Sequence, residues 1–147
     1  MQGEHETKPA YVDVTSATRR RMQAVRRYDT APEMLVRRML HALGYRFRLH
    51  RKDLPGSPDI VLPRHRKIVL VHGCFWHGHE QCKRAKRPNK NAATWRAKID
   101  GNRIRDAKNV AALRELGWDV LIIWECEVRE QARLASRLCE FLPDLRV

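Results

Sequence analysis

The chain has 147 residues, 43% of them hydrophobic, which is enough for one domain with a buried core. Lys and Arg number 30 against 17 Asp and Glu, a formal net charge of +13, so a polyanionic partner is expected and nucleic acid is the leading candidate. No apolar run approaches the roughly 20 residues that span a bilayer, and the polar N-terminus has no signal-peptide core, so we expect a cytoplasmic protein without a membrane partner.

The N-terminal part of the chain is polar and basic. We expect residues 1–13 to be a disordered tail and residues 14–147 to be a single domain, of which 14–28 form a basic arm or helix. Arginine clusters in such arms usually contact phosphates without reading sequence, although a solvated charged helix has the same composition. The residues of interest in the arm are Arg19, Arg20, Arg21 and Met22.

Apolar periodicity predicts alternating helices and strands in the rest of the chain. Thr30-Ala-Pro-Glu33 begins a helix in capping-box form that ends at Gly44, and alternation predicts a strand over 45–49. The other predicted elements are strands at 59–62, 68–71 and 118–124 and helices at 95–116 and 128–142. This order predicts an α/β fold with a mixed central sheet flanked by helices.

His72-Gly-Cys-Phe-Trp-His77 follows the strand expected over 68–71 and is the most informative motif of the chain. Imidazole can move protons or hold a metal near neutral pH, thiolate holds zinc, and adjacent aromatic rings can stack on bases. Asp59 begins another strand, and a carboxylate-held Mg²⁺ beside a histidine would supply what phosphodiester cleavage requires. A Pro-Asp pair is also common in turns, so the interpretation of Asp59 as a site residue depends on the other candidate residues found with it.

The cysteines at 74, 82, 126 and 139 are too few and too scattered for a disulfide framework, which favours metal ligation. Cys74, His79 and Cys82 have a metal-ligand spacing, and the alternative is a buried thiol beside a surface histidine. Cys139 is expected in the core of the last helix. Trp118 and Trp124, which flank or lie in an apolar strand, are also expected in the core.

Several motifs together resemble the very short patch repair (Vsr) mismatch endonucleases. They are Leu54-Pro-Gly-Ser-Pro-Asp59, Val71-His-Gly-Cys-Phe-Trp-His77-Gly-His79, Trp95 with Lys98-Ile99, and Glu115-Leu-Gly-Trp-Asp-Val-Leu-Ile-Ile-Trp-Glu-Cys126. The resemblance implies a variant of the PD-(D/E)xK restriction-endonuclease fold with a structural zinc site. It also implies nicking of double-stranded DNA on the 5′ side of the thymine in a T·G mismatch left by deamination of 5-methylcytosine. A monomer is expected, and mismatch-repair proteins are further candidate partners.

The resemblance assigns roles to the candidate catalytic residues. Asp59 would ligate Mg²⁺, aided by the backbone carbonyl of Val71. His77 would be the general base or orient the water, and His72 would contact the scissile phosphate or a metal-bound water. A histidine pKa near ~6.5 suits proton transfer at cellular pH. Glu33 would orient or polarise the site, although its place in the capping box explains it equally well.

The resemblance also implies a closed tetrahedral Zn²⁺ site, structural because it leaves no position for water. Its ligands would be Cys74, His79, Cys82 and Cys126. Glu80-Gln81 resembles a one-residue insertion relative to the family pattern, and this bears on the assignment of Cys82.

Aromatic residues near the motif are candidates for DNA contact. In the resembled family the rings corresponding to Phe75, Trp76 and Trp95 wedge into the duplex from the major groove, and Met22 would insert from the minor groove. The alternative is that Phe75 and Trp76 are core aromatics. Two other functions stay open: a related nuclease with a different DNA target, and a zinc-stabilised DNA-binding module without catalysis.

Overall fold

The computed structural model describes residues 29–145, so the expected tail and arm, with Arg19, Arg20, Arg21 and Met22, lie outside the described residues. The helices and strands confirm the predicted α/β composition. They are α2 (Ala31–Ala42), β1 (Arg48–Leu49), β2 (Ile60–Leu62), β3 (Lys67–His72), α3 (Ala92–Glu115), β4 (Asp119–Trp124), α4 (Glu125–Val128) and α5 (Gln131–Phe141). Among the described residues, no helix is both long enough and apolar enough to cross a bilayer.

The strands form one mixed sheet, as predicted, and their order is β1-β2-β3-β4. β1, β2 and β3 pair antiparallel, whereas β3 and β4 are parallel. A parallel pair needs a long crossover, which the segment 73–91 and α3 provide. The register of this pair places His72 opposite Trp124, so both strands end at the same edge of the sheet.

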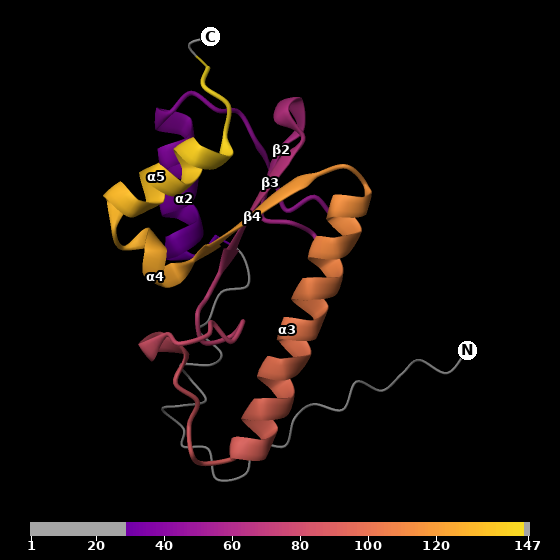
Figure 1. Cartoon of the computed structure of the whole chain (residues 1–147), viewed down its shortest axis with the longest axis vertical. Helices are drawn as coiled ribbons and strands as arrows, with labels where there is room; N and C mark the ends of the chain where they lie inside the picture. Colours follow the sequence, from indigo (N-terminus) through magenta and orange to yellow (C-terminus); the bar gives the residue numbers. More distant parts are fainter. Residues whose placement is uncertain (1–28, 146–147) are drawn as a thin grey trace, which may run out of the picture.

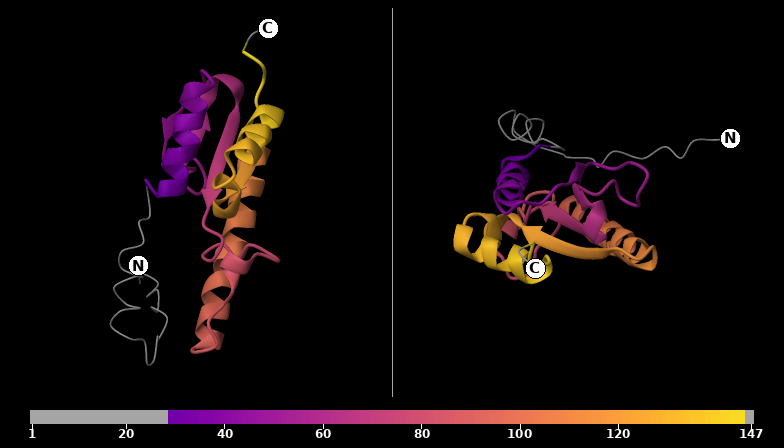
Figure 2. Two further views of the ribbon diagram at one scale, coloured as in Figure 1. Left: turned by 90° about the vertical axis from the view of Figure 1, so that its left-hand side faces the viewer. Right: turned by 90° about the horizontal axis from the view of Figure 1, so that it is seen from above.

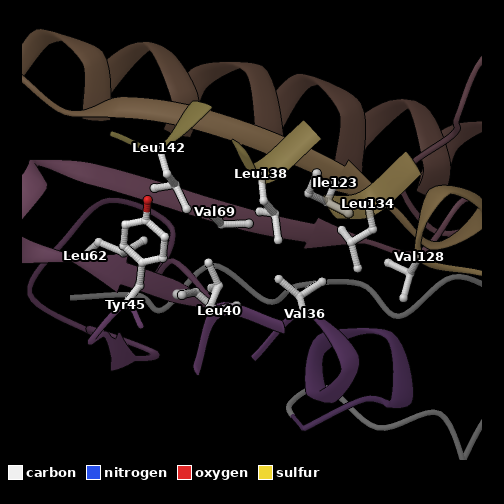
Figure 3. Packing of buried hydrophobic residues seen from close by; sticks show 11 residues of the cluster. Val36, Leu40, Tyr45, Leu62, Val69, Ile123, Val128, Leu134, Leu138 and Leu142 are labelled. Carbon is white, nitrogen blue, oxygen red and sulfur yellow. The ribbon is translucent and has the colours of Figure 1, made fainter. Parts of the chain in front are cut away.

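Alternation along the strands gives the sheet two apolar faces, each covered by helices. α2 and α5 cover one face and α3 covers the other, as Figures 1 and 2 show. Figure 3 shows Val69 and Ile123 of the sheet between the side chains of α2 and α5. The opposite face packs against Val110, Leu113 and Trp118, and the predicted burial of Trp118 is confirmed. The segment 73–91 continues beyond the end of the sheet, beside the first half of α3 (Figure 1).

Two predicted elements differ from the structure. The strand expected over 45–49 is reduced to Arg48–Leu49, because the backbone N–H of Tyr45 bonds to Leu40 and its buried ring donates its hydroxyl to the carbonyl of Pro143. The helix expected over 128–142 begins later, as α5 at Gln131, and the separate short helix α4 precedes it, with Glu130 extended between them.

Two residues expected in the core lie elsewhere. Cys139 is exposed, because α5 buries the stripe of Leu134 and Leu138 and the next position turns away from it. Trp124 is only half-buried, because it ends β4 at the edge of the sheet rather than within a layer of helices. The apolar composition around both residues was the reason for the wrong prediction.

Candidate active site and metal centre

A cavity of about 390 Å³ opens where β2 begins and β3 ends. One wall is the turn 55–58, which approaches α3 so closely that a Cβ on Gly56 would lie 2.7 Å from the Asn109 side chain. Gly56 also has a φ of +75°, so both space and backbone conformation require glycine here. The polar residues that line the cavity are Ser57, Asp59, His72, His77, Arg105, Asp106 and Asn109.

Asp59 is the residue just before β2, and its side chain lines this cavity. Its Oδ2 accepts a hydrogen bond from the N–H of Val71 at 3.0 Å, and its other oxygen has no hydrogen-bond partner among residues 29–145. Burial raises the pKa of Asp59 from 3.8 to about 6, and the charge of Glu33 adds to the increase, while the Val71 N–H and two histidines oppose it. A carboxylate in this situation gains from a bound cation, and oxygen ligands suit Mg²⁺. The residues present therefore fit the expected magnesium site.

Glu33 takes part in a buried network and also in a helix cap. Its backbone N–H donates to the hydroxyl of Thr30 at 3.3 Å, which caps α2. Its carboxylate, only 2% exposed, instead forms an ion pair with Arg37 and lies 3.1 Å from Nε2 of His50. The cap therefore uses the backbone of Glu33 and leaves its charge beside the cavity, where that charge raises the pKa of Asp59.

The two histidines of the motif stack on each other. The ring centroids of His72 and His77 are 3.9 Å apart and their planes differ by 7°. His72 is buried, and burial lowers its pKa from 6.5 to about 4, with further lowering by His77 and opposition from Asp106. His72 is therefore neutral at physiological pH. Together with Asp106, the two histidines offer ligand atoms that lie within 4.8 Å of one another, so this group could hold a metal ion as well as move protons.

Asp106 of α3 completes this group and was missed by the sequence analysis. Its Oδ2 lies 2.6 Å from Nδ1 of His77. When Nδ1 donates to this carboxylate, Nε2 carries the lone pair and can accept a proton. A signal was present: the buried stripe of α3 contains Trp95, Ile99, Val110 and Leu113, and the helical spacing also places Asn102 and Asp106 on that stripe. Polar residues at such positions indicate a site rather than a core.

Cys74, His79, Cys82 and Cys126 converge, as the resemblance implied. One ligand atom from each lies within 4.8 Å of all the others, and Sγ of Cys126 is 3.5 Å from Nδ1 of His79. Burial raises the pKa of Cys74 to about 12. Gln81, just before Cys82, has a φ of +56°, and Cys82 lies in the cluster. Three thiols and one imidazole are a donor set for a tetrahedral metal, so the cluster could bind a metal ion.

The aromatic residues after the strand form a second cluster. Phe75 contacts Trp76 and Trp95 edge to face, with centroids 5.1 and 5.2 Å apart. Asn102 holds this segment by donating to the carbonyl of Trp76 at 2.8 Å. Trp95 is 5% exposed and lies at the base of the cluster, whereas Phe75 and Trp76 are half-buried. The expected contact of Trp95 with bases therefore requires the cluster to open.

Comparison with known proteins agrees with the resemblance seen in the motifs. A family model described as DNA mismatch endonuclease Vsr matches residues 12–84. The Type II nicking enzyme V.XorIIP of Xanthomonas oryzae pv. oryzae (strain KACC10331 / KXO85) is 50% identical over 132 residues, which cover 88% of this chain and 96% of that enzyme. The DNA mismatch endonuclease Vsr of Escherichia coli (strain K12) is 41% identical over 121 residues, 82% and 77% of the two chains. These matches establish that the chain belongs to the Vsr family of DNA endonucleases.

Proposed function

We propose that this protein nicks double-stranded DNA on the 5′ side of the thymine in a T·G mismatch and so initiates very short patch repair. The observation that carries the proposal is the cavity shared by Asp59, His72, His77 and Asp106 in a chain of the Vsr family. The mixed sheet, with Asp59 at the start of one strand and the histidines after the next, is compatible with a PD-(D/E)xK core spanning 14–147.

The chemistry follows from the positions of these side chains. Asp59 and the carbonyl of Val71 would hold Mg²⁺, which when bound neutralises charge on the phosphate and lowers the pKa of a water. Nε2 of His77 accepts the proton of the attacking water. Asp106 keeps the proton on Nδ1 and stabilises the imidazolium that forms. His72 stays neutral and contacts the phosphate, and Glu33 tunes Asp59 through its charge.

Recognition of a mismatch would use the aromatic rings that remain accessible. Inserting Phe75 and Trp76 between base pairs costs a few kcal/mol of stacking, and less where pairing is already distorted. The Cys₃His cluster would hold a structural Zn²⁺ and fix the segment that carries both rings and His77. The proposed arm over 14–28 would bind the opposite groove through Arg19, Arg20, Arg21 and Met22.

T·G duplexes test the proposed substrate. We expect nicking of the T-containing strand in a T·G duplex with Mg²⁺, and at least roughly tenfold slower nicking of the matched C·G and T·A duplexes. End-labelled oligonucleotides on denaturing gels, with varied bases around the mismatch, measure both rates. Several relatives are named Type II nicking enzymes, which keeps a nicking nuclease of another target as the second candidate. Equal nicking of matched DNA would favour that candidate, and no nicking at all would favour a DNA-binding module.

Asp106→Asn tests the assignment of the base. The amide can donate to Nδ1 and would then leave the proton on Nε2, the wrong nitrogen for a base. We expect kcat to fall by roughly a hundredfold or more with little change in KM. The matched control is Asp100→Asn on the same helix, whose carboxylate pairs with Arg87 at 3.0 Å, away from the cavity lining. Wild-type single-turnover rates in Asp106→Asn would remove this residue from the site.

A further inference from the structure

Trp124 stands between the metal-ligand cluster and the catalytic cavity. It ends β4 directly opposite His72 in β3, and it precedes the cluster residue Cys126 by two positions. The sequence suggested a core tryptophan, but the side chain is half-buried at the edge of the sheet. Neither the proposed chemistry nor the proposed metal site uses it.

The contacts of Trp124 form one continuous series of rings. Its indole lies parallel to the imidazole of His79, with centroids 4.1 Å apart and planes 8° apart. Its other neighbour is His72, which meets it edge to face at 5.3 Å and 78°. His72 in turn stacks on His77 at 3.9 Å. The series therefore runs from a cluster ligand through the indole to the imidazole that faces the cavity.

The indole is held in place at both ends. The backbone N–H of Trp124 donates to Oε1 of Glu127 at 3.2 Å. Glu127 is itself buried and faces Nε of Arg137 at 3.4 Å, while Arg137 donates to the carbonyl of Ile122 at 3.0 Å. On the other side, His79 lies 3.5 Å from the thiol of Cys126. The backbone of Trp124 and the ring that stacks on its indole are therefore both held by neighbouring contacts.

The catalytic histidines have open space beside them. A second cavity of about 350 Å³ is lined by His72, His77, Asp106 and Trp124, on the side of the apolar residues of α3. The indole is the aromatic side chain that borders this space next to His72. Removing it would enlarge the cavity and free the His72 ring to rotate, and the His77 ring, which is hydrogen-bonded to Asp106 at one edge, would lose the fixed partner on its face.

We propose that Trp124 is a positioning residue that couples the Cys/His cluster to the catalytic imidazole pair. Its flat ring fixes the rotation of His72, and through the stack it limits the tilt of the His77 ring about its hydrogen bond to Asp106. The inference rests on the proposed function for the role of His77, but the coupling itself is a property of the free protein. Small displacements of a catalytic group lower rates by up to roughly a hundredfold, which sets the expected effect.

Trp124→Leu and Trp124→Phe in the metal-loaded, full-length protein test the coupling. The Leu variant loses the flat ring, so we expect a tenfold to hundredfold lower kcat with an unchanged KM, measured by nicking kinetics. Its metal content, measured by elemental analysis, should stay complete. Its ¹⁵N imidazole signals of His72 and His77, recorded without DNA, should shift. The Phe variant keeps a flat ring and should stay within roughly threefold of the wild-type kcat. Trp118→Phe, a buried tryptophan outside the ring series, is the control for loss of an indole.

Two results would overturn the inference. One is a Leu variant with wild-type kcat and unshifted imidazole signals, and the other is a Phe variant as impaired as the Leu variant. Should the Leu variant not fold, Trp124→Met replaces it with the same outcomes. The imidazole signals are measured without DNA and without nicking. A wild-type protein that failed to nick T·G DNA would therefore refute the proposed function, while these signals would still test the coupling.

Discussion

Asp59→Asn is expected to abolish nicking and, at the same time, to stabilise the metal-free protein at neutral pH. The amide oxygen can still accept the N–H of Val71, so the turn before β2 is kept. The charge that would hold Mg²⁺ is lost, and kcat should fall by at least roughly a hundredfold to a thousandfold. The gain in stability arises because the variant no longer buries a carboxylate whose charge is poorly compensated.

The sign and the pH range follow from the pKa of Asp59. Its pKa is about 6 in the folded protein against 3.8 in an unfolded chain, so the folded state favours the protonated form. Protonated Asp59 therefore adds to the free energy of unfolding. This contribution is fully present below about pH 4 and is lost as the pH rises through 6. The difference corresponds to at most roughly 3 kcal/mol. Asp59→Asn should therefore melt higher than the wild type at pH 8, and the advantage should vanish near pH 4.

Thermal unfolding in EDTA at several pH values, together with nicking assays in Mg²⁺, measures both effects. Asp53→Asn is the matched control, because Asp53 is exposed and its pKa is lowered by a hydrogen bond from Arg51. That variant should keep full nicking and should gain no stability at pH 8. An Asp59→Asn protein that still nicks, or that melts no higher than the wild type at pH 8, would contradict the assignment.

Cys126→Ser is expected to cause the largest loss of stability. Cys126 follows β4, whereas the other cluster residues lie in the segment after β3, so a bound metal would join the two parallel strands beyond their ends. Structural zinc sites contribute folding free energy directly. Loss of one thiolate should lower the bound zinc well below one per chain and reduce Tm by on the order of 10 °C or more.

Elemental analysis and calorimetry measure these two quantities. Cys139→Ser is the control, because Cys139 is an exposed free thiol on α5 outside the cluster. It should keep the zinc content and the Tm of the wild type. A Cys126→Ser protein with full zinc and unchanged melting would show that Cys126 is not a ligand.

Local sequence signals predicted three of the four strands well. Apolar runs located β2, β3 and β4, and turn residues located Asp59 and the histidines at neighbouring strand ends. The parallel pairing of β3 with β4 then follows from the long helix between them. Asp59 and His77 line one cavity because β2 and β3 pair antiparallel, so the start of one strand lies beside the end of the other. The four metal-ligand candidates converge at the same edge of the sheet, where the parallel strands β3 and β4 end.

The missed features depend on contacts between distant parts of the chain. Asp106 meets His77 only because α3 lies back along the sheet, and helix periodicity alone gave no reason to pair them. The end of β4 is fixed by Glu127, whose carboxylate accepts the N–H of Trp124 and starts a helix earlier than composition suggested. The rotation of α5 that exposes Cys139 is likewise set by packing.

The parallel pairing of β3 and β4 has a consequence for synthesis of the protein on the ribosome. Domains emerge from their N-termini, so Asp59, His77 and Asp106 are all present in a nascent chain before the last strand and Cys126 appear. Until then β3 is paired only with β2, the parallel partner of His72 is absent, and the fourth donor of the cluster is missing. The nuclease site is therefore expected to stay incomplete on the ribosome until β4 and Cys126 have been synthesised.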